Sequence, residues 1–387
     1  MEKEKVRLPL PNYVENICKA LENAGYAAYA VGGCVRDLLR NKKPHDFDIA
    51  TSAKPAEIKK LFSHTVDTGI RHGTVTVILP EGIAEVTTFR RDGIYTDSRH
   101  PDSVSFVKSV EDDLSRRDFT VNAIAYSPLR GICDPFDGYG DIERRILRTV
   151  GRAELRFKED ALRILRLYRF AAQLSFSIEK NTQDTALKFA NTVSGVSKER
   201  IYAETEKILM FANENKLKEA SYVLEKLLLF ADFSEQNVNK IAGCFSLSGK
   251  WALLCGEYTV EILRSLHAPK KVVLSAGELS RYKEGEHIVM DVANLRYNSP
   301  EDFFAFIQDE DKRKKWNSAL ESGVPRSMRE LALSGTELKK MGYKGEEIGI
   351  ILNELFLYVI QNPADNKKEQ LREVAQWIYK QKCSVKE

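Results

Sequence analysis

The pattern of apolar and polar residues predicts alternating helices and strands in the N-terminal third of the chain. Apolar positions at helical spacing over residues 12 to 25 predict a first helix that ends near Gly25. The next segments predict a buried strand in "YAAYAVGG", a helix in "CVRDLLRNK" and a second strand in "DFDIAT". A further helix follows in "SAKPAEIKKLF", for which Ser52 is the expected N-cap and Pro55 lies in the first turn.

Two segments rich in β-branched residues, "TVTVILP" and "IAEVTTFR", stand on either side of Pro80-Glu81-Gly82 and predict a β-hairpin. The stretch from Arg91 to Ser109 is rich in Gly, Pro, Asp and Ser, which predicts a long loop. Loops of this length are commonly functional or disordered, so we expect this one to be mobile.

Beyond about Gly151 strand signals become rare, and amphipathic patterns such as "EDALRILRLYRFAAQL" and "KERIYAETEKILMFA" continue to the C-terminus. This change predicts an α+β protein, in which an N-terminal mixed sheet with helices is followed by an all-α remainder. Turn chemistry in "LRYNSPEDFFAF" indicates a second boundary near residue 298.

Composition narrows the class of protein. With 59 basic and 56 acidic residues among 387 the charge is nearly balanced, so a polyanionic partner must be bound by local patches. Six scattered cysteines without a C-x-x-C pair argue against structural zinc and against a disulfide framework. No window approaches about 18 consecutive apolar residues, so we expect no membrane association and a soluble, cytoplasmic protein.

The candidate chemistry begins with Asp46 and Asp48, which are two residues apart on a predicted strand. Residues at this spacing point to the same face, which places the carboxylates roughly 6 to 7 Å apart. Two anions at that distance repel each other unless one is protonated or a cation lies between them, and oxygen ligands favour Mg²⁺. The pair therefore predicts a metal–nucleotide site.

A glycine pair upstream supports the same site. Gly32 and Gly33 follow a predicted strand and open a helix, so backbone amides can approach a phosphate closely, and Arg36 lies on the first turn. A lone glycine pair more often serves packing in a turn. Together with a D-x-D on the next strand, a phosphate-binding role becomes the better interpretation.

Other protein classes also use D-x-D. Haloacid-dehalogenase-like phosphatases place D-x-D-x-T at a strand end, but Ala50 occupies the last position here. Metal-dependent glycosyltransferases lack the "GG…RD" turn before the motif. By contrast, "VGGCVRDLL", "DFDIAT", "EVTTFR", "RRDFTVNA", "DPFDG" and "EDALRILRLYRF", in this order, closely resemble bacterial class II CCA-adding enzymes, the tRNA nucleotidyltransferases of the DNA polymerase beta superfamily. The resemblance spans about residues 29 to 208, and bacterial poly(A) polymerases share most of these motifs.

The resemblance implies a modular organisation and a role for each motif. It implies a catalytic polymerase beta-like head (1–147), a helical neck with a nucleotide-template helix (148–212), a helical body (213–298) and a tRNA-binding tail (299–387). It also implies that Asp46 and Asp48 bind two Mg²⁺ ions, and Glu85 on the hairpin is the candidate third carboxylate. A surface glutamate is the alternative interpretation of Glu85.

For nucleotide binding the resemblance implies contacts from Gly33, Arg36 and Arg117, with Asp118 and Asn122 around Arg117 and with Arg116 as a possible phosphate ligand. In "EDALRILRLYR", Asp160, Arg163, Arg166 and Arg169 recur every three residues on one side of an expected helix. An ordinary salt-bridged helix has the same pattern. The resemblance implies that these four residues contact the nucleotide.

The chemistry of Asp160 and Arg163 suits base selection. A carboxylate accepts hydrogen bonds and a guanidinium donates them. Cytosine and adenine each present an amino donor beside a ring-nitrogen acceptor, whereas guanine and uracil present the reverse. The family resemblance assigns this protein-template role to the same pair, with Arg166 and Arg169 as further contacts.

The expected function is therefore the addition of C, C and A to the tRNA 3′ end from CTP and ATP, with release of pyrophosphate. The loop in "RDGIYTDSRHPDSV" favours the complete activity, since relatives that add only C, C are shortened there. Basic stretches such as "DKRKKW" and Lys339-Lys340 are candidates for binding the tRNA backbone, although solvated helix faces are their default interpretation. A poly(A) polymerase and a non-catalytic RNA-binding protein remain the alternatives.

Overall fold

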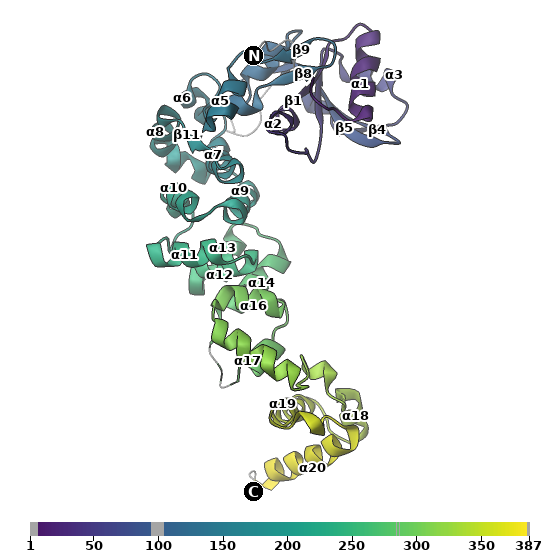
Figure 1. Ribbon diagram of the computed structural model, residues 1–387, viewed down its shortest axis with the longest axis vertical. Helices are drawn as coiled ribbons and strands as arrows, with labels where there is room; N and C mark the ends of the chain where they lie inside the picture. The colour runs from purple at the N-terminus through teal and green to yellow at the C-terminus, as the bar shows by residue number, and fades with distance from the viewer. Residues whose placement is uncertain (1–6, 94–103, 284, 286, 385–387) are drawn as a thin grey trace. The chain divides into compact units, whose positions relative to one another are not determined.

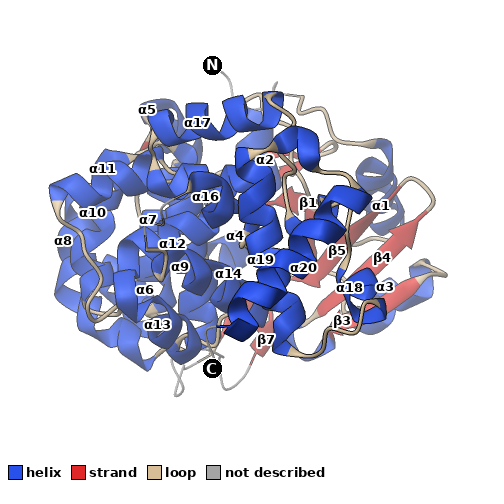
Figure 2. Ribbon diagram, turned by 90° about the horizontal axis from the view of Figure 1, so that it is seen from below, coloured by secondary structure: helices blue, strands red, loops and turns tan. Residues whose placement is uncertain are grey.

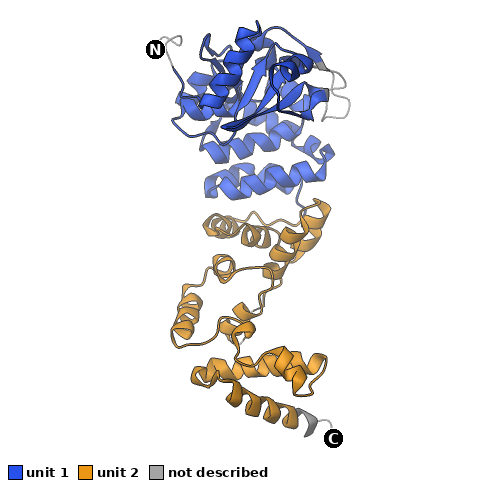
Figure 3. Ribbon diagram, turned by 90° about the vertical axis from the view of Figure 1, so that its right-hand side faces the viewer, with its two compact units in different colours: residues 1–229 blue, residues 230–387 orange. Residues whose placement is uncertain are grey.

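The computed structural model describes residues 7–93, 104–283, 285 and 287–384, so the centre of the predicted loop, residues 94–103, lies outside the described residues. The chain divides into two compact units, Met1–Leu229 and Phe230–Glu387, which Figure 3 colours separately. Each unit has its own buried core and is described here by itself.

Unit 1 begins with a seven-stranded mixed sheet (Figure 1). Its strand order is β3-β4-β5-β2-β1-β8-β9, and the pairing is antiparallel everywhere except between β2 and β5. The strands are β1 (Ala28–Val31), β2 (Asp48–Thr51), β3 (Thr65–Gly69), β4 (Thr74–Leu79), β5 (Gly82–Thr88), β8 (Ala125–Ser127) and β9 (Gly131–Cys133).

Helices and two small sheets complete the N-terminal part of unit 1. α1 and α3 contact each other and the sheet, and α2 packs beside β1. The helical elements are α1 (Asn12–Asn23), α2 (Gly33–Leu39), α3 (Pro55–Leu61), η2 (Ile70–His72), α4 (Val110–Ser115), η3 (Thr120–Asn122) and α5 (Gly138–Arg144). β6 (Arg90–Asp92) pairs with β7 (Val104–Phe106), and β10 (Ile146–Leu147) pairs with β11 (Ser177–Ile178).

The sheet is held against its neighbours by a core in which Val31, Ala50 and Ala125 of three adjacent strands pack with Phe89 and Leu114. Burial of such apolar surface stabilises a fold by about 25 cal/mol per Å². The core therefore fixes β1 and β2 relative to α4, and residues of the candidate site lie on β2 or directly after β1 and α4.

The rest of unit 1 is helical. Its elements are α6 (Ala153–Glu159), α7 (Leu162–Leu174), α8 (Lys180–Phe189), η4 (Ala190–Gly195), α9 (Lys198–Phe211) and α10 (Glu214–Glu225). α7 packs against both α9 and α10, and nearly all of its side chains are buried. Because α7 is enclosed, the arginines along it must be satisfied by partners in the protein or by a ligand.

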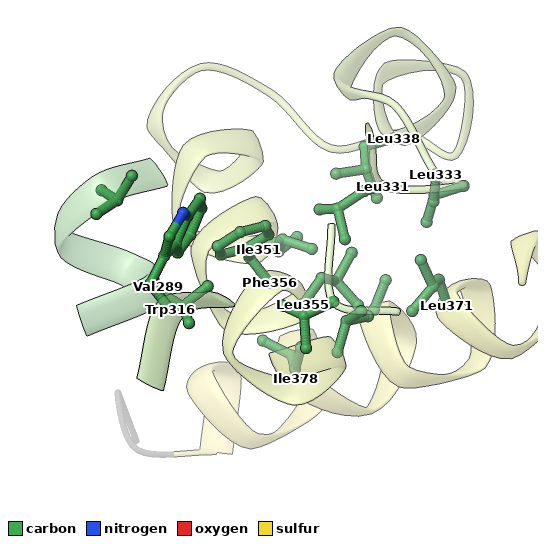
Figure 4. Close-up of a cluster of buried hydrophobic side chains, with 14 of the residues drawn as sticks. Val289, Trp316, Leu331, Leu333, Leu338, Ile351, Leu355, Phe356, Leu371 and Ile378 are labelled. Carbon is green, nitrogen blue, oxygen red and sulfur yellow. The ribbon is translucent and has the colours of Figure 1, made fainter. Parts of the chain in front are cut away.

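Unit 2 contains only helices among its described residues (Figure 2). Its core surrounds Trp316, Leu355 and Leu371, which Figure 4 shows gathered between the helices. No helix in the described ranges is long and apolar enough to cross a membrane. The elements are α11 (Glu235–Gly243), α12 (Leu247–Cys255), η5 (Gly256–Tyr258), α13 (Thr259–Ser265), α14 (Lys270–Ser280), α15 (Ile288–Ala293), α16 (Pro300–Ile307), α17 (Glu310–Glu321), η6 (Met328–Glu330), α18 (Gly335–Lys340), α19 (Glu346–Gln361), η7 (Pro363–Asp365) and α20 (Lys368–Ser384).

The α+β class, the first helix and the hairpin of β4 and β5 are confirmed, and two details of the prediction are wrong. α3 begins at Pro55 after Lys54 as N-cap, because Ser52 instead accepts a hydrogen bond from the Ala27 N–H at 2.9 Å. The expected single helix through "EDALRILRLYR" is interrupted, since α6 ends at Glu159 and α7 begins at Leu162.

Candidate functional site

A cavity of about 620 Å³ in unit 1 brings together residues that are far apart in the sequence. It collects the turn after β1, the start of β2, the segment after α4, and residues of α7 and α9. The lining residues are Gly32, Gly33, Arg36, Asp37, His45, Asp46, Asp48, Arg116, Arg117, Asp118, Asn122, Asp160, Arg163, Arg166, Arg169, Phe170, Gln173 and Arg200. Apart from Glu85, every predicted site residue lies in this one pocket.

The turn after β1 depends on glycine. Gly32 has φ +78°, a conformation that L side chains rarely adopt, and a Cβ at this position would lie 2.7 Å from Nη1 of Arg117. Gly33 is the first residue of α2, as predicted. The backbone of this turn and the Arg117 guanidinium are therefore in close contact at one edge of the pocket.

The two aspartates of the D-x-D lie at the N-terminal end of β2. β2 begins at Asp48, so Asp46 precedes the strand, and the expectation that both residues belong to it is wrong. Asp48 is accessible from the pocket, yet burial by the surrounding protein raises the pKa of its carboxyl to about 6. Arg117 opposes this shift, whereas the charges of Asp46 and Glu85 add to it.

Glu85 stands opposite Asp48 in the parallel pairing of β2 and β5, but it is exposed and does not line the cavity. Among the described residues no group of three or more His, Cys, Asp or Glu side chains is arranged to hold a metal ion. The pocket itself therefore offers the Asp46 and Asp48 pair, and the role of Glu85 as a third carboxylate stays a prediction.

Asp160 lies between α6 and α7 and is not part of a continuous helix. Its Oδ1 accepts a hydrogen bond from the Leu162 N–H at 3.0 Å, and its Oδ2 accepts one from Nη2 of Arg200 at 2.7 Å. Arg163 follows on the first turn of α7 and is 8% exposed. Its guanidinium donates to Glu159 and to the backbone oxygens of Arg156 and Arg116.

Further along α7, Arg166 donates from Nε and Nη2 to Oδ2 of Asp118 at 2.8 and 2.6 Å. Burial alone would raise the pKa of Asp118, but Arg166 and the hydrogen bond from Asn122 hold it well below its usual range. Arg169 pairs with Glu204 of α9 and lies 3.8 Å from the centre of the Phe170 ring. These contacts fix both guanidinium groups along one wall.

Arg36 and its partners form another part of the pocket lining, and the Arg36 guanidinium lies 5.4 Å from the centre of the Phe170 ring. Arg36 donates from Nη1 to Oδ1 of Asn122 at 2.6 Å and from Nε to Asp37 at 2.9 Å. Asn122 in turn donates to Asp118 at 3.1 Å. These hydrogen bonds connect Arg36, on the first turn of α2, through Asn122 and Asp118 to Arg166 on α7, so the polar side chains of the pocket form one continuous network.

The charges in the pocket follow a simple rule. Each of the seven lining arginines forms an ion pair with a carboxylate, through the pairs Arg36–Asp37, Arg116–Asp113, Arg117–Asp113, Arg163–Glu159, Arg166–Asp118, Arg169–Glu204 and Arg200–Asp160. Within the described part of the chain, Asp46 and Asp48 are the lining carboxylates that form no ion pair. They are thus the two acidic groups available to a cation.

Sequence reasoning missed Arg200 and Phe170 as lining residues. Arg200 and Glu204 are one turn apart on α9, and both face arginine or aspartate partners of the α6–α7 segment. Their i, i+4 spacing in "KERIYAE" is the one signal in the sequence, but the same spacing is common in surface ion pairs. Only the packing of α9 against α7 distinguishes the two cases.

The chain is similar to known proteins over both units. Residues 28–148 match the family "Poly A polymerase head domain", and residues 175–216 match "Probable RNA and SrmB- binding site of polymerase A". A CCA-adding enzyme of Geobacillus kaustophilus is 43% identical over 284 residues, which is 68% of each chain. One of Lactobacillus delbrueckii subsp. bulgaricus is 50% identical over 194 residues, 50% of this chain and 49% of that protein.

A solved structure is similar over almost the whole length. The crystal structure of the Bacillus stearothermophilus CCA-adding enzyme in complex with CTP has a TM-score of 0.76 and 31% identity, and the match covers 96% of this chain and 97% of that one. In the sequence comparison with the Lactobacillus protein, by contrast, this chain spans about half the length of its relative.

Proposed function

This chain belongs to the family of CCA-adding enzymes, and from that membership and the pocket we propose that it adds C, C and A to the 3′ end of tRNA. It is proposed to use CTP and ATP as substrates and to release pyrophosphate, as a nucleotidyltransferase. The observation that carries the proposal is the pocket, in which two unpaired aspartates face a wall of arginines. A nucleoside triphosphate with a bound cation needs both kinds of group.

We assign the divalent cation site to Asp46 and Asp48, with Mg²⁺ as the expected ion. Support comes from the chemistry of the donors: both are hard oxygen ligands, and within the described residues neither forms an ion pair with an arginine. Burial raises the pKa of Asp48, so a bound cation would stabilise its carboxylate. When bound there in a two-metal arrangement, Mg²⁺ would activate the primer 3′-hydroxyl and stabilise the leaving pyrophosphate.

The phosphates are proposed to lie against the turn at Gly32 and Gly33. Gly33 opens α2 there, and Arg36 and Arg117 line the same cavity and supply positive charge. The guanidinium groups are already oriented by Asp37, Asn122 and Asp113. Such preorganisation favours binding because less side-chain freedom is lost when the ligand arrives.

Base selection is assigned to Asp160 and Arg163. Two Arg163 donors on Nη1 and one on Nη2 are used within the protein, which leaves Nε–H and one Nη2–H for a base. Oδ2 of Asp160 accepts one hydrogen bond from Arg200 and retains a second lone pair for an amino group. Cytosine and adenine satisfy both groups, whereas guanine and uracil place donor against donor and acceptor against acceptor.

The tRNA is proposed to contact the helical part of the chain, where Lys314, Lys315, Lys339 and Lys340 are exposed. Basic side chains bind the phosphate backbone by displacing counterions. We keep the division into head (1–147), neck (148–212), body (213–298) and tail (299–387) as part of this functional proposal. We also propose a cytoplasmic location, where a tRNA substrate would be available.

The test is an extension assay with the purified full chain, Mg²⁺ and a tRNA that lacks its 3′ CCA. With CTP alone we expect addition to stop after two nucleotides, and with CTP and ATP together after three. A long ladder with ATP alone would identify a poly(A) polymerase. Binding of tRNA without any extension would identify a non-catalytic RNA-binding protein and refute the proposal.

A further inference from the structure

Asp113, on α4, is the buried carboxylate that binds two of the pocket arginines at once. It is 1% exposed and does not itself line the cavity. Its Oδ1 accepts hydrogen bonds from Nε and Nη2 of Arg116 at 3.1 and 2.8 Å. Its Oδ2 accepts one from Nη2 of Arg117 at 3.3 Å, and the Arg90 N–H of β6 donates to Oδ1 at 3.3 Å.

The two arginines are bound in different ways. Arg116 uses a two-point contact, which fixes the plane of its guanidinium. Within the described residues, the Arg117 side chain donates a hydrogen bond from Nη2 alone, and its other terminal nitrogen, Nη1, lies beside Gly32, where a Cβ would come within 2.7 Å. Asp113 therefore anchors one end of the Arg117 guanidinium while the other end reaches the edge of the glycine turn.

The charge of Asp113 supports this anchoring. Burial by itself would raise its pKa, but Arg116 and Arg117 hold the pKa below its ordinary value, so the residue is an anion at neutral pH. Removing one partner of a buried ion pair leaves an uncompensated charge, so Asp113 and the two arginines depend on each other. The remaining contact, to the Arg90 backbone, ties the same carboxylate to β6 of the two-stranded β6–β7 sheet.

A second link leads from this cluster to the base-selecting residue. The backbone oxygen of Arg116 accepts a hydrogen bond from Nη2 of Arg163 at 3.0 Å. The backbone oxygen of Ser115, the preceding residue, accepts one from Nη1 of Arg156 at 3.0 Å. The end of α4 thus binds residues of both α6 and α7.

We propose that Asp113 is a positioning residue for nucleotide binding, which holds Arg117 against the glycine turn and Arg116 beside it so that both meet the triphosphate. This inference rests on the proposed function and adds a residue outside the pocket to it. Asp113 acts through the two arginines and does not read the base. Asp113 binds the side chains of these arginines, whereas Arg163 binds the backbone oxygen of Arg116, so loss of Asp113 should weaken CTP and ATP equally and leave the choice between C and U unchanged.

The test measures the equilibrium dissociation constant of CTP by calorimetry with the full chain. Asp113→Asn keeps the size of the side chain and an acceptor for the Arg90 N–H but removes the charge, so we expect CTP and ATP binding to weaken by about tenfold. Asp112→Asn is the matched control, since Asp112 is the neighbouring residue on α4 and pairs with Arg91. We expect it to change CTP affinity by less than about twofold.

A double-mutant cycle distinguishes positioning of Arg117 by Asp113 from a general contribution of Asp113 to the fold. In an Arg117→Ala background, the effect of Asp113→Asn on CTP affinity should shrink to about threefold or less, because only Arg116 is left to be misplaced. The same loss in both backgrounds would show that Asp113 supports the fold in general and would overturn the inference. Unchanged CTP affinity in a folded Asp113→Asn protein would overturn it too.

If Asp113→Asn does not fold, as judged by thermal unfolding, Asp113→Glu keeps the buried charge and moves the carboxylate by one methylene. A folded Asp113→Glu protein with weakened CTP binding supports the inference, and one with wild-type affinity contradicts it. Failure of the wild-type chain to bind CTP would instead refute the proposed function, which the Asp113 comparison does not touch.

Discussion

At the scale of single residues, the pocket is organised by pairing. Every lining arginine has a carboxylate partner, and the aspartates left over are Asp46 and Asp48 within the described residues. The paired arginines are fixed in orientation by their carboxylate partners. The unpaired aspartates remain available to bind a cation. The cost is borne by Asp48, whose carboxyl is ionised in surroundings that disfavour the charge.

The Asp48 carboxyl should therefore destabilise the fold at neutral pH in the absence of divalent cations. The ordinary pKa of the group is 3.8, and in the folded chain it is raised to about 6. The folded state therefore binds the proton more tightly than the unfolded state, and the free energy of unfolding falls as the pH rises from about 4 to about 6. We expect Asp48→Asn to melt at a higher temperature than wild type at pH 7.5 in EDTA, with a smaller difference at pH 5.

Asp184→Asn, at an exposed position of α8, serves as the control and should leave the melting temperature unchanged at both pH values. Asp48→Asn should also lose extension activity. A melting temperature equal to or below that of wild type at pH 7.5 would contradict the origin that we give for the raised pKa.

At the scale of elements, regular patterns were predictable and interruptions were not. α1, β1 and the β4–β5 hairpin follow from apolar periodicity because each buries one side of a regular element. β3 has a mostly exposed, polar pattern and was not predicted. The break at Asp160 was missed because "EDALRILRLYR" is locally favourable for one helix, and the interruption depends on contacts with Leu162 and Arg200.

The same holds for the site. Asp46, Asp48, Gly33 and the α7 arginines could be found because short motifs carry them. Glu204 and Arg200 could not, since their partners Arg169 and Asp160 are far away in the sequence and meet them only through the packing of α7 and α9. Asp113 is three and four residues before Arg116 and Arg117, but this spacing is also common in surface ion pairs, and only the structure shows that Asp113 is buried.

The turn between β1 and α2 gives a prediction at this scale. Gly32→Ala introduces a Cβ 2.7 Å from Nη1 of Arg117 at φ +78°, so we expect CTP affinity to fall by about tenfold or more. Gly25→Ala is the matched control: Gly25 also has a positive φ, +91°, but nothing lies within 4 Å of the added Cβ.

Both substitutions should destabilise the fold by about 1 to 2 kcal/mol through backbone strain. Only Gly32→Ala should change nucleotide binding, which calorimetric titration with CTP would measure. Equal CTP affinity in the two variants would show that the glycine turn does not contact the nucleotide.

At the scale of the whole molecule, the chain separates a nucleotide site from a helical unit with a core of its own. All lining residues of the pocket belong to unit 1, and the cluster around Trp316 and Leu355 belongs to unit 2. The proposed chemistry therefore belongs to unit 1, which contains the pocket. The exposed lysines of α17 and α18 are the reason for placing part of the tRNA contact in unit 2.

A chain that ends at Leu229 should therefore retain CTP binding within about threefold and lose at least about tenfold in tRNA affinity, because it keeps the pocket and lacks the basic helices. Calorimetry with CTP and gel-shift titration with tRNA at fixed salt measure the two quantities. Wild-type tRNA affinity of the shortened chain would show that unit 2 does not bind the substrate.

The central claim is that one pocket both catalyses transfer and selects the base through Asp160 and Arg163. The direct measurement compares kcat/KM for CTP and UTP in the first addition to a tRNA lacking CCA, for wild type and for Asp160→Ala. We predict a preference for CTP on the order of 10³ or more in wild type, reduced to within about tenfold in the variant. A preference that stays the same in an active Asp160→Ala enzyme would contradict the account.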